Sequence, residues 1–154
     1  MQIIFRKNSD QEHGIRIIRA DNSSEETTLN SRSFLRHDFG HFAAESELQL
    51  QEAYWGSVAQ GMALAGKEIR GKEIAIAESL ATRIQGLLRN EAGSEEFIRT
   101  LKKVQPELIT DAIADKIYQR CRGLLGRWRA TPFGGEMKLL WPETESVDGK
   151  EKQN

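Results

Sequence analysis

Cysteine, proline and long apolar runs are all scarce in this chain of 154 residues. Its single cysteine, Cys121, excludes an internal disulfide and a cysteine-rich zinc site, and it is typical of a protein from a reducing compartment. The longest run of mostly small or apolar residues, 53–66, is too short to span a bilayer, and the first residues lack the apolar core of a signal peptide. The sequence therefore predicts a cytoplasmic protein with no membrane partner.

The chain also lacks an excess of charge of either sign. Its 22 basic and 23 acidic residues give a formal net charge of -1, so no overall field attracts nucleic acid or anionic lipid. Four arginines cluster near the end of the last predicted helix, where positive charge complements the helix dipole. They are Arg120, Arg122, Arg127 and Arg129. Because Trp128 is the only aromatic residue among them, we do not expect nucleic acid as a partner.

The two ends of the chain carry the strand signals. Segments 3–7 and 14–19 are rich in β-branched residues and are separated by turn residues, which predicts a β-hairpin. The connection 20–30 is polar, with at most a short strand at its end. Segment 136–141 is predicted to be a further strand that joins the hairpin in a small antiparallel sheet.

Apolar residues at three- and four-residue spacing predict about five helices between the strands. A serine, Ser31 or Ser33, is expected to cap the first helix, and Ser94 the fourth, which ends before Pro106. The fold class is therefore α+β and mainly helical, as a single domain over 1–142 with a disordered polar tail over 143–154. The helices are expected at about 33–48, 51–65, 68–88, 94–105 and 109–128.

The first predicted helix concentrates polar groups, because it holds two of the three histidines: His37 and His41, with Asp38 and Glu45. Residues four apart lie on one helix face, so His37, His41 and Glu45 lie above one another. This spacing is found in sites for a divalent metal such as zinc and in proton-transfer pairs. His37 and His41 are the candidate metal ligands. Asp38 and Glu45 are the candidate catalytic acids or bases.

A third metal ligand has to come from outside this helix. Eight helical residues rise about 12 Å, so Glu45 and His37 cannot bind one ion from a straight helix. Five other carboxylates are candidates and no spacing selects among them: Glu52, Glu68, Glu78, Asp111 and Asp115. Without a metal, two explanations remain for the histidines. They are interfacial or partly buried groups, hydrogen-bonded to Asp38, Glu45 or backbone, that fix the helix on the sheet, or they form an acid–base pair with a carboxylate.

Other chemistry-bearing residues fit the core better than a site. Cys121 falls on the apolar stripe of the last helix, where a small core residue is expected rather than a reactive thiol. The pair Trp55 and Gly56 could form one wall of a pocket, but core packing explains it better. The small residues of the predicted helix over 53–65 could pack within one chain or between two copies, so a homo-oligomer stays open.

Two characterised motifs share part of this pattern. The run His-Asp-x-x-His resembles the zincin protease motif His-Glu-x-x-His only in spacing, because aspartate reaches less far toward a bound water. The pair His37 and Asp38 is similar to the eponymous element of the HD phosphohydrolases, an all-helical family that adds an upstream histidine and a downstream aspartate. Here His13 lies in the predicted hairpin, and Asp111 or Asp115 has no flanking motif.

Three segments together resemble a group of uncharacterised bacterial proteins: LRHDFGHFAAE at 35–45, YWGSVAQG at 54–61 and FGGEMKLLWP at 133–142. The resemblance implies a bacterial, cytoplasmic protein of one domain and no particular reaction. The residues predict a binding or interaction protein whose polar site is formed by His37, Asp38, His41 and Glu45. The alternative is a metal-dependent hydrolase in which His37 and His41 bind the ion.

Overall fold

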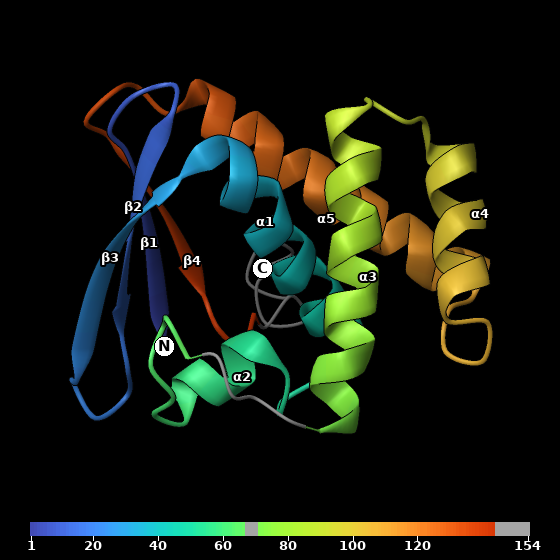
Figure 1. Ribbon diagram of the computed structural model, residues 1–154, viewed down its shortest axis with the longest axis horizontal. Helices are drawn as coiled ribbons and strands as arrows, with labels where there is room; N and C mark the ends of the chain where they lie inside the picture. The colour runs from blue at the N-terminus through green and yellow to red at the C-terminus, as the bar shows by residue number, and fades with distance from the viewer. Residues whose placement is uncertain (67–70, 144–154) are drawn as a thin grey trace, which may run out of the picture.

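A computed structural model describes residues 1–66 and 71–143 of the chain, and within them it confirms the α+β class. The described strands form one antiparallel sheet in the order β3-β2-β1-β4 (Figure 1). The expected hairpin is β1 and β2, and the carboxyl-terminal strand pairs with β1 as predicted. The strands are β1 (Gln2–Lys7), β2 (Glu12–Ile18), β3 (Ser24–Asn30) and β4 (Glu136–Leu140).

The described helices lie on one side of the sheet in two layers (Figure 1). Helices α1 and α5 pack against the sheet, while α3 packs on α1 and α4 on α5, and the short α2 covers one end of α1. None of these helices has the length and apolar character needed to cross a membrane. The helices are α1 (Ser31–Leu48), α2 (Tyr54–Ala59), α3 (Lys72–Arg89), α4 (Ser94–Val104) and α5 (Asp111–Ala130).

Several expected element ends were wrong. Asn30, not Ser31 or Ser33, caps α1, because its side-chain Oδ1 accepts a hydrogen bond from the Ser33 backbone N–H at 3.1 Å. Ser94 is the first residue of α4 and makes no side-chain cap hydrogen bond. Segment 24–30 is a full strand rather than a polar connection with a short end. The start expected for the third helix and the expected tail beyond 143 lie outside the described residues.

The helix expected over 51–65 is also wrong, because only Tyr54–Ala59 is helical. Gly56 approaches the chain before it so closely that a Cβ there would lie 1.9 Å from the Gln51 carbonyl oxygen, which favours a tight turn over a continuous helix. Gly61, with a φ of +114°, then turns the chain away from helical geometry. Gly56 therefore allows a close approach of two chain segments, and Gly61 allows a turn.

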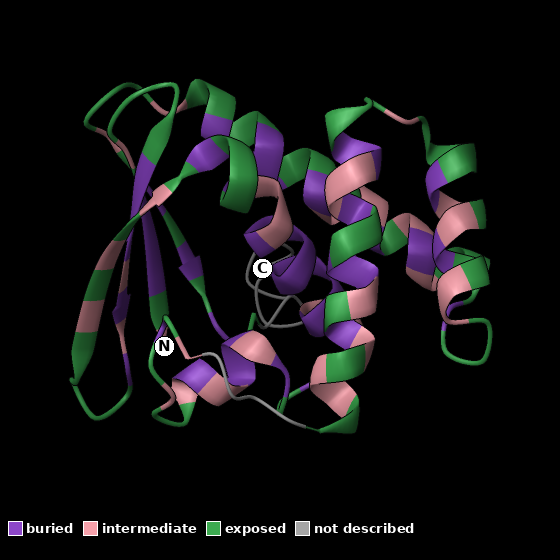
Figure 2. Cartoon of the chain, in the orientation of Figure 1, coloured by how far each residue is buried: buried purple, intermediate pink, exposed green. Residues whose placement is uncertain are grey.

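One hydrophobic core connects the sheet to all five described helices (Figure 2). Alternate residues of β1 face it, and the Phe5 ring meets the Phe39 ring of α1 edge-on at 5.3 Å between centroids. Trp55 and Cys121 are fully buried, so their expected core positions are confirmed. Burial also raises the pKa of the Cys121 thiol to about 12, which fits a core residue.

Helices α1 and α3 approach closely at Gly40. A Cβ at this position would lie 3.2 Å from Ile84 Cγ2 and 3.3 Å from the Ala81 Cα, so only glycine fits without displacing α3. Gly40 stands directly before His41 on α1, and Glu78 stands one turn before Ala81 on α3. The close approach therefore places Glu78 near the histidine face of α1.

Candidate metal centre

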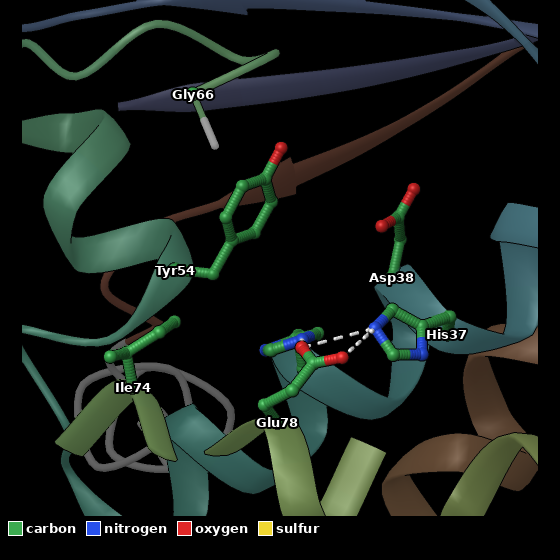
Figure 3. Close-up of a pocket in the computed structure, with 7 residues that line it drawn as sticks. His37, Asp38, Tyr54, Gly66, Ile74 and Glu78 are labelled. Carbon is green, nitrogen blue, oxygen red and sulfur yellow. Dashed lines mark hydrogen bonds and ion pairs between the residues drawn. The ribbon is translucent and has the colours of Figure 1, made fainter. Parts of the chain in front are cut away.

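A cleft of about 320 Å³ opens between α1, α2 and α3 (Figure 3). Helix α1 contributes most of its polar groups, and Figure 3 shows the Glu78 carboxylate of α3 reaching toward them. Three of the four residues expected on α1 therefore lie in a concave site, whereas Glu45 is fully buried and does not line it. The lining residues are His37, Asp38, His41, Tyr54, Gly66, Ile74 and Glu78.

Three side chains converge in this cleft. The Glu78 carboxylate lies 3.2 Å from His37 Nε2 through one oxygen and 2.7 Å from His41 Nε2 through the other. One ligand atom from each residue lies within 4.8 Å of the others, a separation from which a small shift could close them around one ion. Among the carboxylates left open by the sequence, Glu78 is the one that joins the histidines.

The Nε2 atoms of both imidazoles face Glu78, and the Nδ1 atom of each lies beside a hydrogen-bond acceptor. His41 Nδ1 lies 2.9 Å from Glu45 Oε2, and His37 Nδ1 lies 3.2 Å from Gln85 Oε1. The Gln85 amide is itself oriented, because its Nε2 donates to the Ser33 carbonyl at 2.9 Å. Since both acceptors take a proton from Nδ1, each neutral imidazole directs the lone pair of its Nε2 into the cleft.

Glu45 is a fully buried carboxylate with three donors. Besides His41, the backbone N–H groups of Trp55 and Tyr54 donate to it at 2.8 and 3.1 Å, which caps the start of α2. Burial raises the pKa of Glu45, and the hydrogen bonds from His41 and the two amides oppose that rise. Its geometry suits a group that orients His41 and fixes α2.

The charges in the cleft favour a protonated His41 when no ion is bound. Burial lowers the pKa of His41, but the hydrogen bonds and charges of Glu45 and Glu78 outweigh it and raise the pKa to about 9. The hydrogen bond from His41 lowers the pKa of Glu78 to about 2, against the effect of partial burial and with help from His37. The site therefore holds one positive charge between two carboxylates.

Asp38 has a different environment from the other carboxylates. It is 8% exposed, and among the described residues no hydrogen bond reaches its carboxylate. Burial raises the pKa of Asp38 to about 7, with the Glu78 charge adding to the rise and His41 opposing it. Such a carboxyl group exchanges its proton near neutral pH, which is the property of a general base.

Tyr54 forms another wall of the cleft and was not singled out by the sequence. Its ring lies 5.6 Å from the His41 ring, and its hydroxyl donates to the Leu64 carbonyl at 2.8 Å. Burial raises the pKa of the Tyr54 hydroxyl, so the residue stays neutral and packs beside the imidazole.

The other candidate residues lie outside the cleft. His13 is fully buried, with Nδ1 2.9 Å from the Ser31 hydroxyl, and burial lowers its pKa to about 4. Asp111 forms an ion pair with Lys102 at 2.7 Å between α4 and α5. The upstream histidine and the downstream Asp111 considered from the HD phosphohydrolase pattern therefore do not join His37 here. Glu52 and Asp115 do not line the cleft, and Glu68 lies outside the described residues.

Comparison of the chain with protein-family models, with curated proteins and with solved structures finds no match in any of the three. The resemblance to a group of bacterial proteins stays an expectation, and the function has to be argued from the geometry of the cleft.

Proposed function

We propose that this protein binds a divalent transition-metal ion through His37 Nε2, His41 Nε2 and the Glu78 carboxylate. One observation carries the proposal: three ligand atoms of suitable type lie within 4.8 Å of one another. Glu45 and Gln85 hold the Nδ1 atoms of the two imidazoles, so that their Nε2 atoms are oriented toward this point. Oriented histidines with an acceptor behind each ring are the usual support of a protein metal site. The proposal keeps the binding function expected from the sequence and adds Glu78 to its site.

The ligand set indicates which ions fit. Two imidazoles and one carboxylate suit zinc, and also iron, manganese or nickel in their divalent states, with positions left open for water or another ligand. Zinc–nitrogen bonds are about 2.0–2.1 Å long, so an ion would replace the hydrogen bond that now joins His41 to Glu78. The exposed side of Glu78 faces solvent and gives an ion a way in.

Metal content tests this proposal directly. Protein made without an affinity tag, loaded with zinc and dialysed, is expected to retain about one equivalent by elemental mass spectrometry. The His37→Ala, His41→Ala double variant and Glu78→Gln should retain none. Glu73→Gln, a carboxylate outside the ligand set and five residues earlier on α3, is the matched control and should retain the wild-type amount.

Glu78→Gln is the decisive variant, because more than half of the Glu78 side chain is exposed and its loss should leave the fold intact. Folded Glu78→Gln with wild-type metal content would contradict the proposed ligand set. Folded wild-type protein that retains no zinc, iron, manganese or nickel, even after reconstitution, would contradict metal binding altogether.

Asp38 favours a second candidate function, a metal-dependent hydrolase. An ion in the cleft would supply Lewis acidity, and Asp38, which no other described side chain binds, could take the proton of an attacking water. Of the two candidate carboxylates, Glu45 already accepts hydrogen bonds from three donors, so we assign it the role of positioning His41. Asp38 is then the group that takes the proton.

Model esters test the hydrolase. Zinc- and manganese-loaded protein should cleave p-nitrophenyl acetate or bis(p-nitrophenyl) phosphate, and Asp38→Asn should lower kcat about 100-fold or more while the metal content is unchanged. Equal turnover in Asp38→Asn would remove Asp38 from the reaction. Absence of turnover with bound metal would leave the protein as a metal binder.

A cytoplasmic location in a bacterium belongs to the same proposal. It is supported by the single cysteine, which is free and buried, and by the resemblance of segment 35–45 to bacterial proteins. Fractionation of cells that express the untagged protein would test the location.

A further inference from the structure

A second cleft, of about 480 Å³, lies at the start of α1, away from the metal centre. Three arginines line it: Arg32 and Arg36 from the first turns of α1, and Arg129 from the last turn of α5. A helix face repeats every 3.6 residues, so Arg32 and Arg36 point to one side of α1 and His37 and His41 to another. The two clefts are therefore separate.

The positive charge of this cleft is not balanced. Among the described residues, no hydrogen bond or ion pair reaches the guanidinium groups of Arg32, Arg36 and Arg129, and the Nε of Arg36 is buried without a partner. Asp10 is the one carboxylate among the described lining residues. Three guanidinium groups against one carboxylate leave a net charge of about two, while the positive end of the α1 dipole and the negative end of the α5 dipole roughly offset each other at the cleft.

The geometry points to a binding site for a phosphate group, as inorganic phosphate or as a small phosphate monoester. A phosphate monoester carries about -1.5 to -2 charges near pH 7, which matches the cleft, and guanidinium groups bind its oxygens in pairs. Inorganic phosphate would not fill the cleft, and the apolar side formed by Leu35, Leu125 and Trp128 offers room for a small organic part. This inference does not depend on the metal centre.

Calorimetric titration of the metal-free protein tests the site. Inorganic phosphate and phenyl phosphate are titrated at constant ionic strength in the presence of a chelator, so that binding to an ion is excluded. Arg36→Gln and Arg129→Gln should each raise the Kd about 10- to 100-fold, because each removes a charged hydrogen-bond donor. Arg122→Gln, which changes an exposed arginine outside the cleft on the same helix as Arg129, is the control and should leave the Kd unchanged.

Each outcome decides the inference. Tighter binding of phenyl phosphate identifies a monoester site, and equal binding identifies a site for phosphate itself. Saturation by neither ligand would overturn the inference, as would the same loss of affinity in Arg122→Gln as in Arg36→Gln. Glu78→Gln should bind phosphate as the wild type does, and loss of phosphate binding there would assign it to the metal centre. Thermal melts verify that each variant is folded.

Discussion

The buried carboxyl group of Asp38 should make the protein less stable as the pH rises from about 4 to about 7. Burial raises its pKa in the folded protein to about 7, whereas an unfolded chain has an aspartate pKa of about 3.9. Between these values the folded state holds a proton that the unfolded state has lost. The free energy of unfolding therefore falls through this window.

The size of the effect follows from the difference between the two pKa values. About three pKa units correspond to an upper bound of about 4 kcal/mol, because one unit is worth about 1.4 kcal/mol. Rearrangement of the cleft around the charged form reduces this, so we expect about 2–4 kcal/mol. The side-chain amide that Asp38→Asn introduces has the shape of the protonated acid and never carries the charge. The variant should match the wild type near pH 4 and exceed its stability by that amount at pH 8.

Urea unfolding followed by circular dichroism at pH 4, 6 and 8 measures this difference. The protein has to be free of metal, because an ion would change the charge of the cleft. Asp10→Asn makes the same chemical change in the exposed turn between β1 and β2 and is the matched control. A difference between Asp38→Asn and wild type that stays constant from pH 4 to 8 would refute the reasoning. An Asp38→Asn variant less stable than wild type at pH 8 would also do so.

Three further substitutions test contacts around the site. Gly56→Ala should lower the melting temperature strongly, with a loss of about 3 kcal/mol or more, because the new Cβ would overlap the Gln51 carbonyl oxygen. Glu45→Gln should lower the free energy of urea unfolding by about 2–4 kcal/mol, because the NH2 group of the new side chain would face the Trp55 N–H, another donor. The same variant should bind zinc about 10- to 100-fold more weakly in a competition titration. Arg19→Met should cost about 2–3 kcal/mol in the same unfolding assay, because the guanidinium donates to two backbone carbonyls at and after α2. Wild-type behaviour in any of the three would show that the contact contributes little.

The local pattern of α1 could be predicted from the sequence because it depends on helix periodicity alone. The spacing of His37, His41 and Glu45 placed these residues on one face, and the structure adds that His41 binds Glu45 through Nδ1. The rise of about 12 Å over eight helical residues likewise excluded Glu45 as a partner of His37 in one metal site. Periodicity gave no information on which other helix would pack beside the face that carries His37, His41 and Glu45.

The proposed third ligand, Glu78, could not be predicted, because its position depends on how two helices pack. Glu78 was one of several carboxylates without a distinguishing spacing. Gly40, a helix-interior glycine between the two histidines, costs helix propensity and so indicates a close helix contact. In the structure this contact lies at Ala81, one turn after Glu78, but Glu73 before Ala77 has a comparable spacing, so the pattern does not select Glu78.

The helix that contains α2 was predicted too long for a related reason. Small and apolar residues over 51–65 fit helical periodicity, but the start of α2 is fixed by the Glu45 carboxylate, which accepts the N–H groups of Tyr54 and Trp55. A cap supplied by a residue nine or ten positions earlier leaves no local pattern in the sequence. Tyr54 reaches the cleft through this capped start, which explains why it was not recognised as a lining residue.

These contacts connect the proposed ligands to the fold. Glu45 both orients His41 and caps α2, while Gln85 orients His37 and binds the Ser33 carbonyl of α1, so each imidazole is held by a group that also joins two segments. A site held in this way exists in the metal-free fold, unlike the sites of zinc fingers, whose folding needs the ion. An ion that binds the folded state should therefore add to the stability of a protein that is already folded.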